Sequence, residues 1–270
     1  MKTATLNRPK NPTSPSLGAG TPSDAHRGTG SPPDDTLREC EIHRLAETDR
    51  SIRTASTIAG VGLLAMSVLS ALGYLVAVKG IVVPGNAART ARNIAGHKDM
   101  FRFGILNLYL VAALDVVVAW ALHRVFRPVS DALSKVAAWL RVAYAGFFAV
   151  AISQLVGALR FPARALQHVN DFTKIWDAGL VLFGLNLLVL AYLAYRSGYV
   201  PRLLSSLLGI AGFGYVFDSV VRTLVRGSAS DISAITGMGE FVFALWLVIR
   251  GRRINVSASE LHDNTVGVSR

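Results

Sequence analysis

The sequence is poor in cysteine and in acidic residues, and both shortages restrict what the protein does. A single cysteine, Cys40, excludes an internal disulfide and any metal site built from several cysteines. Acidic residues number 17 against 28 basic ones, which gives a formal net charge of +11. In a soluble domain this excess would suggest nucleic-acid binding. Here the basic residues flank apolar runs, as in membrane loops, and we expect no nucleic-acid partner.

Recognisable catalytic and cofactor signatures are also missing. The sequence has no HExxH zinc motif, no Gly-x-Ser-x-Gly nucleophile elbow and no phosphate-binding P-loop. Gly209, Gly212 and Gly214 superficially match a dinucleotide fingerprint, but they lie inside an apolar run with no strand before it, which favours helix packing. We therefore predict no metal site, no cofactor and no enzymatic activity.

Long apolar runs dominate the sequence. Hydrophobic residues make up 51% of the chain, and its mean hydropathy is +0.41. Runs of about 20 apolar residues are long enough to cross the hydrocarbon of a bilayer as helices. We predict an all-α polytopic membrane protein with six transmembrane helices in a bundle. The expected spans cover residues 54–78, 103–126, 133–158, 175–195, 203–225 and 232–249.

Composition divides the chain into three parts. Residues 1–35 are rich in Pro, Ser, Thr and Gly and are expected to be a disordered N-terminal tail. Residues 36–253 contain a juxtamembrane helix and the six-helix domain, and residues 254–270 form a polar C-terminal tail. Thr36 and Glu39 fit a capping box at the start of the juxtamembrane helix.

The loops are expected to contain short helices that lie at the bilayer interface. Asn86 follows Pro84-Gly85 and can cap a helix over residues 87–96. Residues 159–174 are expected to form another loop. In the first span, small residues recur at helical spacing, which favours close helix contact in lipid, although small residues are also common throughout membrane helices. These residues are Ser56, Gly60, Ser67 and Ala71.

Several short motifs occur in an order that resembles a known family. They are Val-Val-Pro-Gly (82–85), Leu-Asp-Val (114–116), Arg-Pro-Val (127–129), Leu-Arg-Val (140–142), Tyr-Arg-Ser-Gly-Tyr-Val-Pro-Arg (195–202), Gly-Tyr-Val-Phe-Asp-Ser (214–219), Gly-Glu-Phe (239–241) and Leu-Trp-Leu-Val-Ile-Arg-Gly (245–251). Over about residues 50–251 the chain resembles the bacterial integral-membrane family catalogued as domain of unknown function 4386. The resemblance implies a six-helix protein of a bacterial cell membrane and supplies no activity.

The distribution of Lys and Arg predicts the orientation and the lipid partner. These residues are slightly more frequent near the spans on the side that bears both termini, which favours cytoplasmic termini in the bacterial inner membrane. The expected partner is a bilayer with anionic lipid headgroups. Whether the chain binds another protein or forms a homo-oligomer stays open.

Two charged residues deep in apolar runs are predicted to pair. Asp115 lies thirteen residues before Pro128 and Arg141 thirteen residues after it. In an antiparallel hairpin that turns at Arg127-Pro128, the two side chains should reach the same depth. Because an unpaired charge in a bilayer costs several kcal/mol, each is the obvious partner of the other.

A second charge cluster is predicted on the last two spans. Asp218 and Glu240 each lie eleven residues from Ala229, and Arg222 follows Asp218 by one helical turn, where it can bridge both acids. Two carboxylates that share one arginine leave one carboxylate to titrate, so the cluster is a possible proton or ligand site. The alternative is that buried ion pairs only fix helix register and rotation.

Three lone polar residues are candidates to line the same interior: Asn107, Gln154 and Asn186. Such residues more commonly form interhelical hydrogen bonds than bind ligands. The leading functional hypothesis is a non-enzymatic protein that acts in membrane interactions or structure. One alternative is a small-solute or proton-coupled transporter that uses the buried acids. The other is an intramembrane enzyme that uses Asp218, Glu240 and Arg222.

Overall fold

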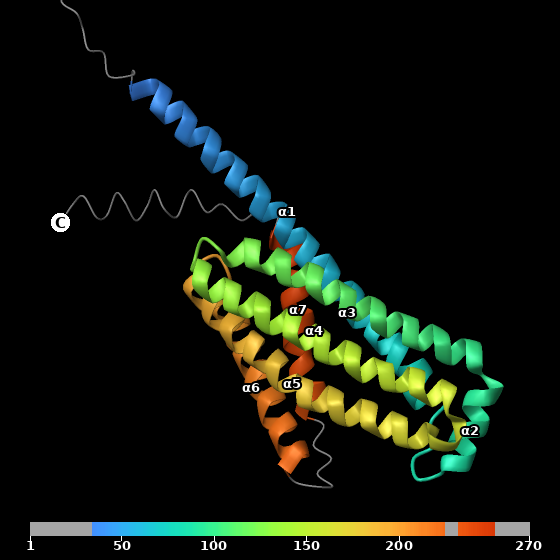
Figure 1. The fold of residues 1–270 in the computed structure, drawn as a ribbon. Helices are drawn as coiled ribbons and strands as arrows, with labels where there is room; N and C mark the ends of the chain where they lie inside the picture. Colours follow the sequence, from blue (N-terminus) through green and yellow to red (C-terminus); the bar gives the residue numbers. More distant parts are fainter. Residues whose placement is uncertain (1–33, 225–231, 252–270) are drawn as a thin grey trace, which may run out of the picture. The chain divides into compact units, whose positions relative to one another are not determined.

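The computed structural model describes residues 34–224 and 232–251 (Figure 1). The chain divides into two compact units, Met1–Glu41 and Ile42–Arg270, and the helix bundle belongs to the second. The described residues form helices joined by short turns and contain no strand, which confirms the all-α prediction for this part of the chain. The predicted C-terminal tail, and all but residues 34 and 35 of the N-terminal tail, lie outside the described residues.

Seven α-helices and two short helical segments follow one another along the described chain. They are α1 (Asp34–Tyr74), the π-helix η1 (Leu75–Lys79), α2 (Ala87–Gly96), α3 (Lys98–Phe126), α4 (Asp131–Arg160), the 3₁₀-helix η2 (Pro162–Arg164), α5 (Ala165–Arg196), α6 (Arg202–Leu224) and α7 (Ile232–Arg250).

Five segments of the described chain are long and apolar enough to cross a membrane. They are Asp49–Tyr74, Lys98–Phe126, Asp131–Arg160, Pro162–Arg196 and Arg202–Arg222. The sixth expected span falls on α7, in which the stretch Gly239–Ile249 is apolar. A membrane protein with several spanning helices is therefore supported by length and composition, and the sixth span stays a prediction.

Helices α3, α4, α5 and α6 pack side by side in chain order, and α7 packs against α6 (Figure 1). Their shared interior is filled by large side chains such as Phe101, Phe148 and Leu208. Large apolar side chains also cover the outer surface, as expected of helices that face lipid. Leu203 is 75% exposed and Leu106 is 68% exposed.

Glycines bring α5 and α6 into close contact. A Cβ added to Gly184 would lie 2.7 Å from the carbonyl oxygen of Gly212, and a Cβ added to Gly212 would lie 2.8 Å from that of Gly184. No real side chain fits at such distances, so each glycine is required for this approach. The packing interpretation of the α6 glycines is confirmed at Gly212. At Gly209 an added Cβ would make only an ordinary contact with Ala191.

The small residues of α1 serve two different purposes. A Cβ on Gly60 would lie 2.7 Å from the Val248 side chain of α7, and the buried Ser56 packs against Gly251. This part of the face is a helix contact, as the spacing predicted. Ser67 and Ala71 instead line a cavity, described below.

Two helix boundaries differ from the predicted ones. Helix α1 begins at Asp34, so Thr36 lies inside the helix and not at its N-cap. The loop expected over residues 159–174 is mostly helical, because α5 begins at Ala165. Its first turns are polar, but polarity does not prevent a helix that satisfies its own backbone hydrogen bonds. The true connection is short and contains Pro162, which cannot donate a backbone hydrogen bond.

The short helix α2 has the predicted bounds and cap. The side chain of Asn86 accepts a hydrogen bond from the backbone N–H of Arg89 at 2.9 Å. Thr90 is buried and exchanges hydrogen bonds with the backbone of Val83, which holds α2 against the preceding turn. A location of α2 at the bilayer interface stays a prediction.

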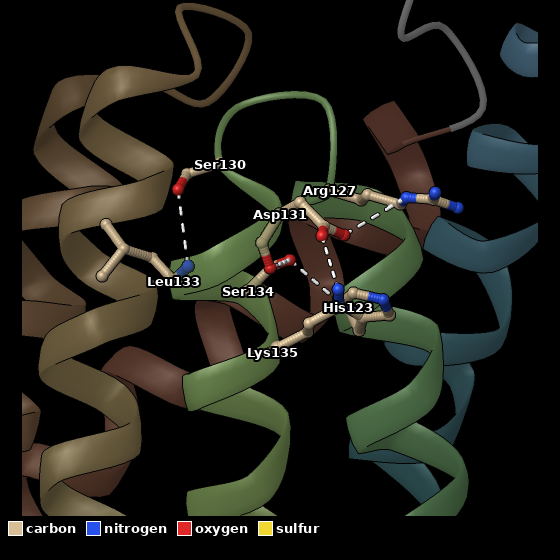
Figure 2. A network of polar contacts seen from close by, with 7 residues as sticks. All are labelled: His123, Arg127, Ser130, Asp131, Leu133, Ser134 and Lys135. Atoms are coloured by element: carbon tan, nitrogen blue, oxygen red, sulfur yellow. Dashed lines mark hydrogen bonds and ion pairs between the residues drawn. The ribbon is translucent and has the colours of Figure 1, made fainter. Parts of the chain in front are cut away.

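The turn between α3 and α4 aligns these two helices (Figure 2). Ser130 caps α4 by accepting a hydrogen bond from the backbone N–H of Leu133. Asp131 forms ion pairs with Arg127, at 3.3 Å, and with Lys135, at 2.6 Å. The turn contains Pro128, as expected. Because it is short, it fixes the position of α4 along α3.

Two further contacts hold this end of the bundle. His123 on α3 and Ser134 on α4 are hydrogen-bonded at 2.9 Å (Figure 2). The Tyr199 hydroxyl, in the turn between α5 and α6, donates a hydrogen bond to the backbone carbonyl of Val125 at 2.9 Å. Burial raises the pKa of the Tyr199 phenol, so the group keeps the proton that it donates.

Candidate functional site

The hairpin of α3 and α4 brings Asp115 and Arg141 into contact. Arg141 Nε lies 2.8 Å from Asp115 Oδ1, and the two side chains are 2% and 1% exposed, respectively. The guanidinium carbon of Arg141 also lies 5.3 Å from the ring centroid of Phe183 on α5. The arginine therefore has a carboxylate at its edge and an aromatic ring at its face.

Arg222 on α6 lies between two carboxylates. Its Nη2 is 2.9 Å from Asp218 Oδ2, one turn earlier on the same helix, as the spacing predicted. Its Nη1 is 3.5 Å from Oδ1 of Asp177 on α5. The Ser219 hydroxyl donates to the backbone carbonyl of Asp177, which fixes this part of α5 against α6. The sequence reading missed Asp177, although an acid just inside an apolar run was a usable signal.

Glu240 on α7 does not have the surroundings that the sequence predicted. Its strongest electrostatic interactions are with Arg141 and Asp115, whereas the prediction placed it with Asp218 and Arg222. Equal depth on two neighbouring helices does not decide which way each side chain faces, and this explains the error. Glu240 Oε1 is buried and has no hydrogen-bond partner among the described residues.

The buried charges therefore form two groups with the same composition. The Arg141 group consists of Asp115, Arg141 and Glu240, and the Arg222 group consists of Asp177, Asp218 and Arg222. Each group contains two carboxylates and one guanidinium. With all six groups ionised, each would carry an excess negative charge.

Both groups border one cavity of about 600 Å³ between the helices, and part of its lining is exposed. Its lining comes from α1, η1 and α3 to α7, so most of the bundle contributes to it. The charged residues that line it are Lys79, Asp115, Arg141, Asp177, Arg222 and Glu240. Ser67 and Ser70 of α1 add hydroxyl groups to the lining.

A continuous series of aromatic rings, here called the aromatic wall, also lines this cavity. The consecutive centroid distances are 5.6 Å for Tyr74–Trp176, 5.8 Å for Trp176–Phe148, 6.0 Å for Phe148–Tyr144, 4.8 Å for Tyr144–Phe183 and 5.3 Å for Phe183–Tyr215. Trp176 Nε1 donates a hydrogen bond to the Tyr144 hydroxyl at 3.1 Å, which joins α5 to α4. Sequence reasoning did not find the wall, because its rings come from four helices.

The three predicted interior polar residues lie apart from this cavity. Asn107 donates to the backbone carbonyl of Phe103 on its own helix, not to a neighbouring helix. Gln154 pairs with His168 at 3.0 Å and so joins α4 to α5, as expected of an interhelical hydrogen bond. Asn186 is buried, and its Nδ2 has no hydrogen-bond partner in the described part of the chain. None of the three is among the residues that line the cavity.

The lining combines a few fixed charges with a largely apolar surface. No group of three or more His, Cys, Asp or Glu side chains within residues 34–224 and 232–251 is arranged to hold a metal ion. The carboxylates face guanidinium groups, and the remaining surface is aromatic or aliphatic. Such a mixture of an apolar wall and a few fixed charges is typical of small-molecule sites.

Comparison with known proteins identifies the family. Residues 58–251 match the family described as Domain of unknown function (DUF4386), and the chain belongs to this family. The chain is also similar to a protein of Archaeoglobus fulgidus described as uncharacterized, with 36% identity over 153 residues. That similarity covers 57% of this chain and 86% of the archaeal protein. No solved structure matches the chain.

Proposed function

We propose that this protein is a non-enzymatic, six-span protein of the bacterial inner membrane that binds a small solute in the cavity of its bundle. The cavity, about 600 Å³ in volume, is the observation that carries the proposal. Its volume lies within the range of small-molecule sites, and it is bordered by charges that a purely structural core has little reason to contain. Because the carboxylates face arginines, the arrangement favours recognition over catalysis.

The proposed sixth span is α7. This helix has 19 residues and ends at Arg250, a residue type that commonly marks the end of a span at the bilayer interface. Six spans place both termini on one side of the membrane, and the modest excess of Lys and Arg on that side favours the cytoplasm.

Access to the cavity tests the proposal directly. Replacing Cys40 by serine gives a cysteine-free background, because it is the only cysteine of the chain. In this background, Ser70→Cys places a thiol in the cavity lining. The matched control, Ala59→Cys, lies on the same helix at a fully buried position outside the cavity lining.

We expect the neutral reagent methyl methanethiosulfonate to modify Ser70→Cys readily in detergent micelles and Ala59→Cys slowly. Reaction at the two positions at the same slow rate would show that no solute reaches the cavity. That result would favour the alternative in which the buried charges only fix helix register.

A proton-coupled transporter is the second candidate, favoured by the unpartnered oxygen of Glu240 at the cavity. It predicts proton flux into proteoliposomes above that of lipid-only vesicles, and loss of the flux in Glu240→Gln. A flux equal to the lipid background would leave a binding protein that does not transport.

Anionic lipid is the proposed membrane partner, and a groove between α1 and α3 supports it. This groove, of about 380 Å³, is lined by Arg50, Arg124, Trp120 and Thr54, and Glu47 is the one acid among its described lining residues. The Arg124 guanidinium lies over the Trp120 ring, 5.0 Å from its centroid, and Trp120 is half exposed. A lipid phosphate beside two arginines, with its acyl chain on the exposed apolar surface, fits this groove.

Native mass spectrometry with phosphatidylglycerol and phosphatidylcholine tests this partner. Arg50→Gln with Arg124→Gln should lower retained phosphatidylglycerol about thirtyfold, since each arginine near the headgroups contributes about 1 kcal/mol. Arg127→Gln with Lys135→Gln removes the same charge from the α3–α4 turn, where both side chains already pair with Asp131. An equal loss in both double variants would show general charge attraction in place of a lipid site.

A further inference from the structure

We propose that the cavity selects an organic cation, a small molecule that bears an ammonium group. This inference rests on the proposed function and specifies its ligand. Three features of the lining support it: the balance of its charges, the aromatic wall and the unpartnered oxygen of Glu240.

The charge balance of the Arg141 group favours a positive guest. Arg141 interacts with Asp115 and Glu240, so in this group carboxylates outnumber the guanidinium two to one, whereas Asp177 and Arg222 contribute one charge of each sign to the lining. Among the described lining residues Lys79 is the remaining cation, but it is exposed, and its charge is therefore more strongly screened. With its groups ionised, the part of the cavity beside Arg141 thus has an excess of negative charge, which a cation would neutralise.

The aromatic wall supplies a second attraction for the same kind of ligand. Ring faces carry partial negative charge and hold ammonium and guanidinium groups, most strongly at tryptophan and tyrosine. The wall already holds one cation, because Arg141 lies over the face of Phe183. The other cavity-lining rings include Trp176, Tyr144 and Tyr215, and the two tyrosines interact electrostatically with Glu240.

Glu240 provides the specific contact. Its buried Oε1 lacks a hydrogen-bond donor among the described residues, and such an acceptor is costly to leave unpaired. An ammonium group would donate to this oxygen and place its alkyl or methyl groups on the rings. A neutral guest without a donor would leave the oxygen unpaired. An anionic guest would meet arginines that already face carboxylates.

Charged thiol reagents of similar size test this selectivity in the cysteine-free background. The probes are trimethylammonium-ethyl methanethiosulfonate, which is cationic, and sulfonatoethyl methanethiosulfonate, which is anionic. Ser70→Cys reports on the cavity. Ser206→Cys, at an exposed position on α6, gives the ratio of the two rates outside the cavity. We expect the cation-to-anion rate ratio to be about tenfold higher at Ser70→Cys, as expected for one net charge at short range.

Adding Glu240→Gln to Ser70→Cys should bring this ratio down toward its value at Ser206→Cys. Glu47→Gln removes an exposed carboxylate elsewhere on the protein and is the matched control. Choline should protect Ser70→Cys from the neutral reagent, whereas 3,3-dimethylbutan-1-ol, its neutral isostere, should not.

The outcomes separate the two proposals. Ready reaction of Ser70→Cys with the neutral reagent, but with no preference for the cationic one, would overturn the cation inference and leave the binding cavity intact. Equal protection by choline and its isostere, or a ratio that Glu240→Gln leaves unchanged, would overturn it as well. Failure of all three reagents at Ser70→Cys, with normal reaction at Ser206→Cys, would overturn the proposed function itself.

Discussion

The α3–α4 turn and the cavity use the same chemical groups in opposite proportions. At the turn, one carboxylate, Asp131, lies between two cations, Arg127 and Lys135, and the three side chains are 46% to 62% exposed. At the Arg141 group, two carboxylates lie near one guanidinium, and the central ion pair is 1% to 2% exposed. In water an imbalance of this kind is screened and has little effect. Inside a bundle it must be neutralised, by a proton or by a bound cation, and the exposed turn has no such requirement.

The largest expected effect comes from breaking the central pair of the cavity. Asp115→Asn removes the carboxylate in direct contact with Arg141, and Arg141→Gln leaves Asp115 and Glu240 buried without their shared cation; each change should lower the free energy of unfolding by about 3 to 5 kcal/mol. The double variant should be little worse than either single one, because it removes both charges. Thermal unfolding of the purified protein in detergent measures this cycle. Simple additivity of the two effects would show that the charges do not stabilise each other.

A smaller effect is expected at the Arg222 group. Asp218→Asn leaves Arg222 with Asp177, so the arginine keeps one carboxylate, and the loss should be about 1 to 2 kcal/mol. Asp177→Asn should behave in the same way, and the double variant should be destabilised by more than the sum. If the two single losses matched that of Asp115→Asn, Arg222 would depend on both acids at once.

Glu240→Gln, unlike the changes at Asp115 and Arg141, should not destabilise the protein. It removes a carboxylate that has no hydrogen-bond donor among the described residues, so we expect the free energy of unfolding to stay unchanged or to rise by about 1 kcal/mol. The same unfolding measurement checks this. A loss as large as that of Asp115→Asn would mean that Glu240 is a structural partner of Arg141, and its proposed role in ligand binding would lose its basis.

The smallest effect is expected at the turn. Asp131→Asn breaks two exposed ion pairs and should leave the midpoint of thermal unfolding unchanged within the error of the measurement. Ser130, which caps α4, is untouched by this change. A clear drop in the midpoint would show that the ion pairs help to align α3 with α4.

The contact between Asp115 and Arg141 was predictable because the turn that joins their helices is short. With little freedom in the turn, distance from Pro128 sets depth, and charges at equal depth in lipid have few other partners. The same reasoning failed for Glu240. The connection between α6 and α7 includes residues 225–231, which lie outside the described part of the chain, and depth alone left the facing direction of α7 undetermined.

Asp177 shows a second limit of prediction from the sequence. It lies near the start of the apolar run of α5, where an acid reads as part of a loop, yet the helix already extends from Ala165 and turns this side chain toward Arg222. The aromatic wall was equally hidden, because its rings are distributed over four helices and have no local spacing in common.

The amino-acid sequence by itself determined the helical class, the apolar segments, the α3–α4 hairpin and the family, because these depend on local composition, short turns and motif order. Only the tertiary structure decided that Glu240 lies with Arg141, that Asp177 completes the Arg222 group and that both groups share one cavity. These features depend on the rotation of each helix about its axis, which packing sets through contacts such as Gly184 on Gly212. No periodicity within a single helix contains that information.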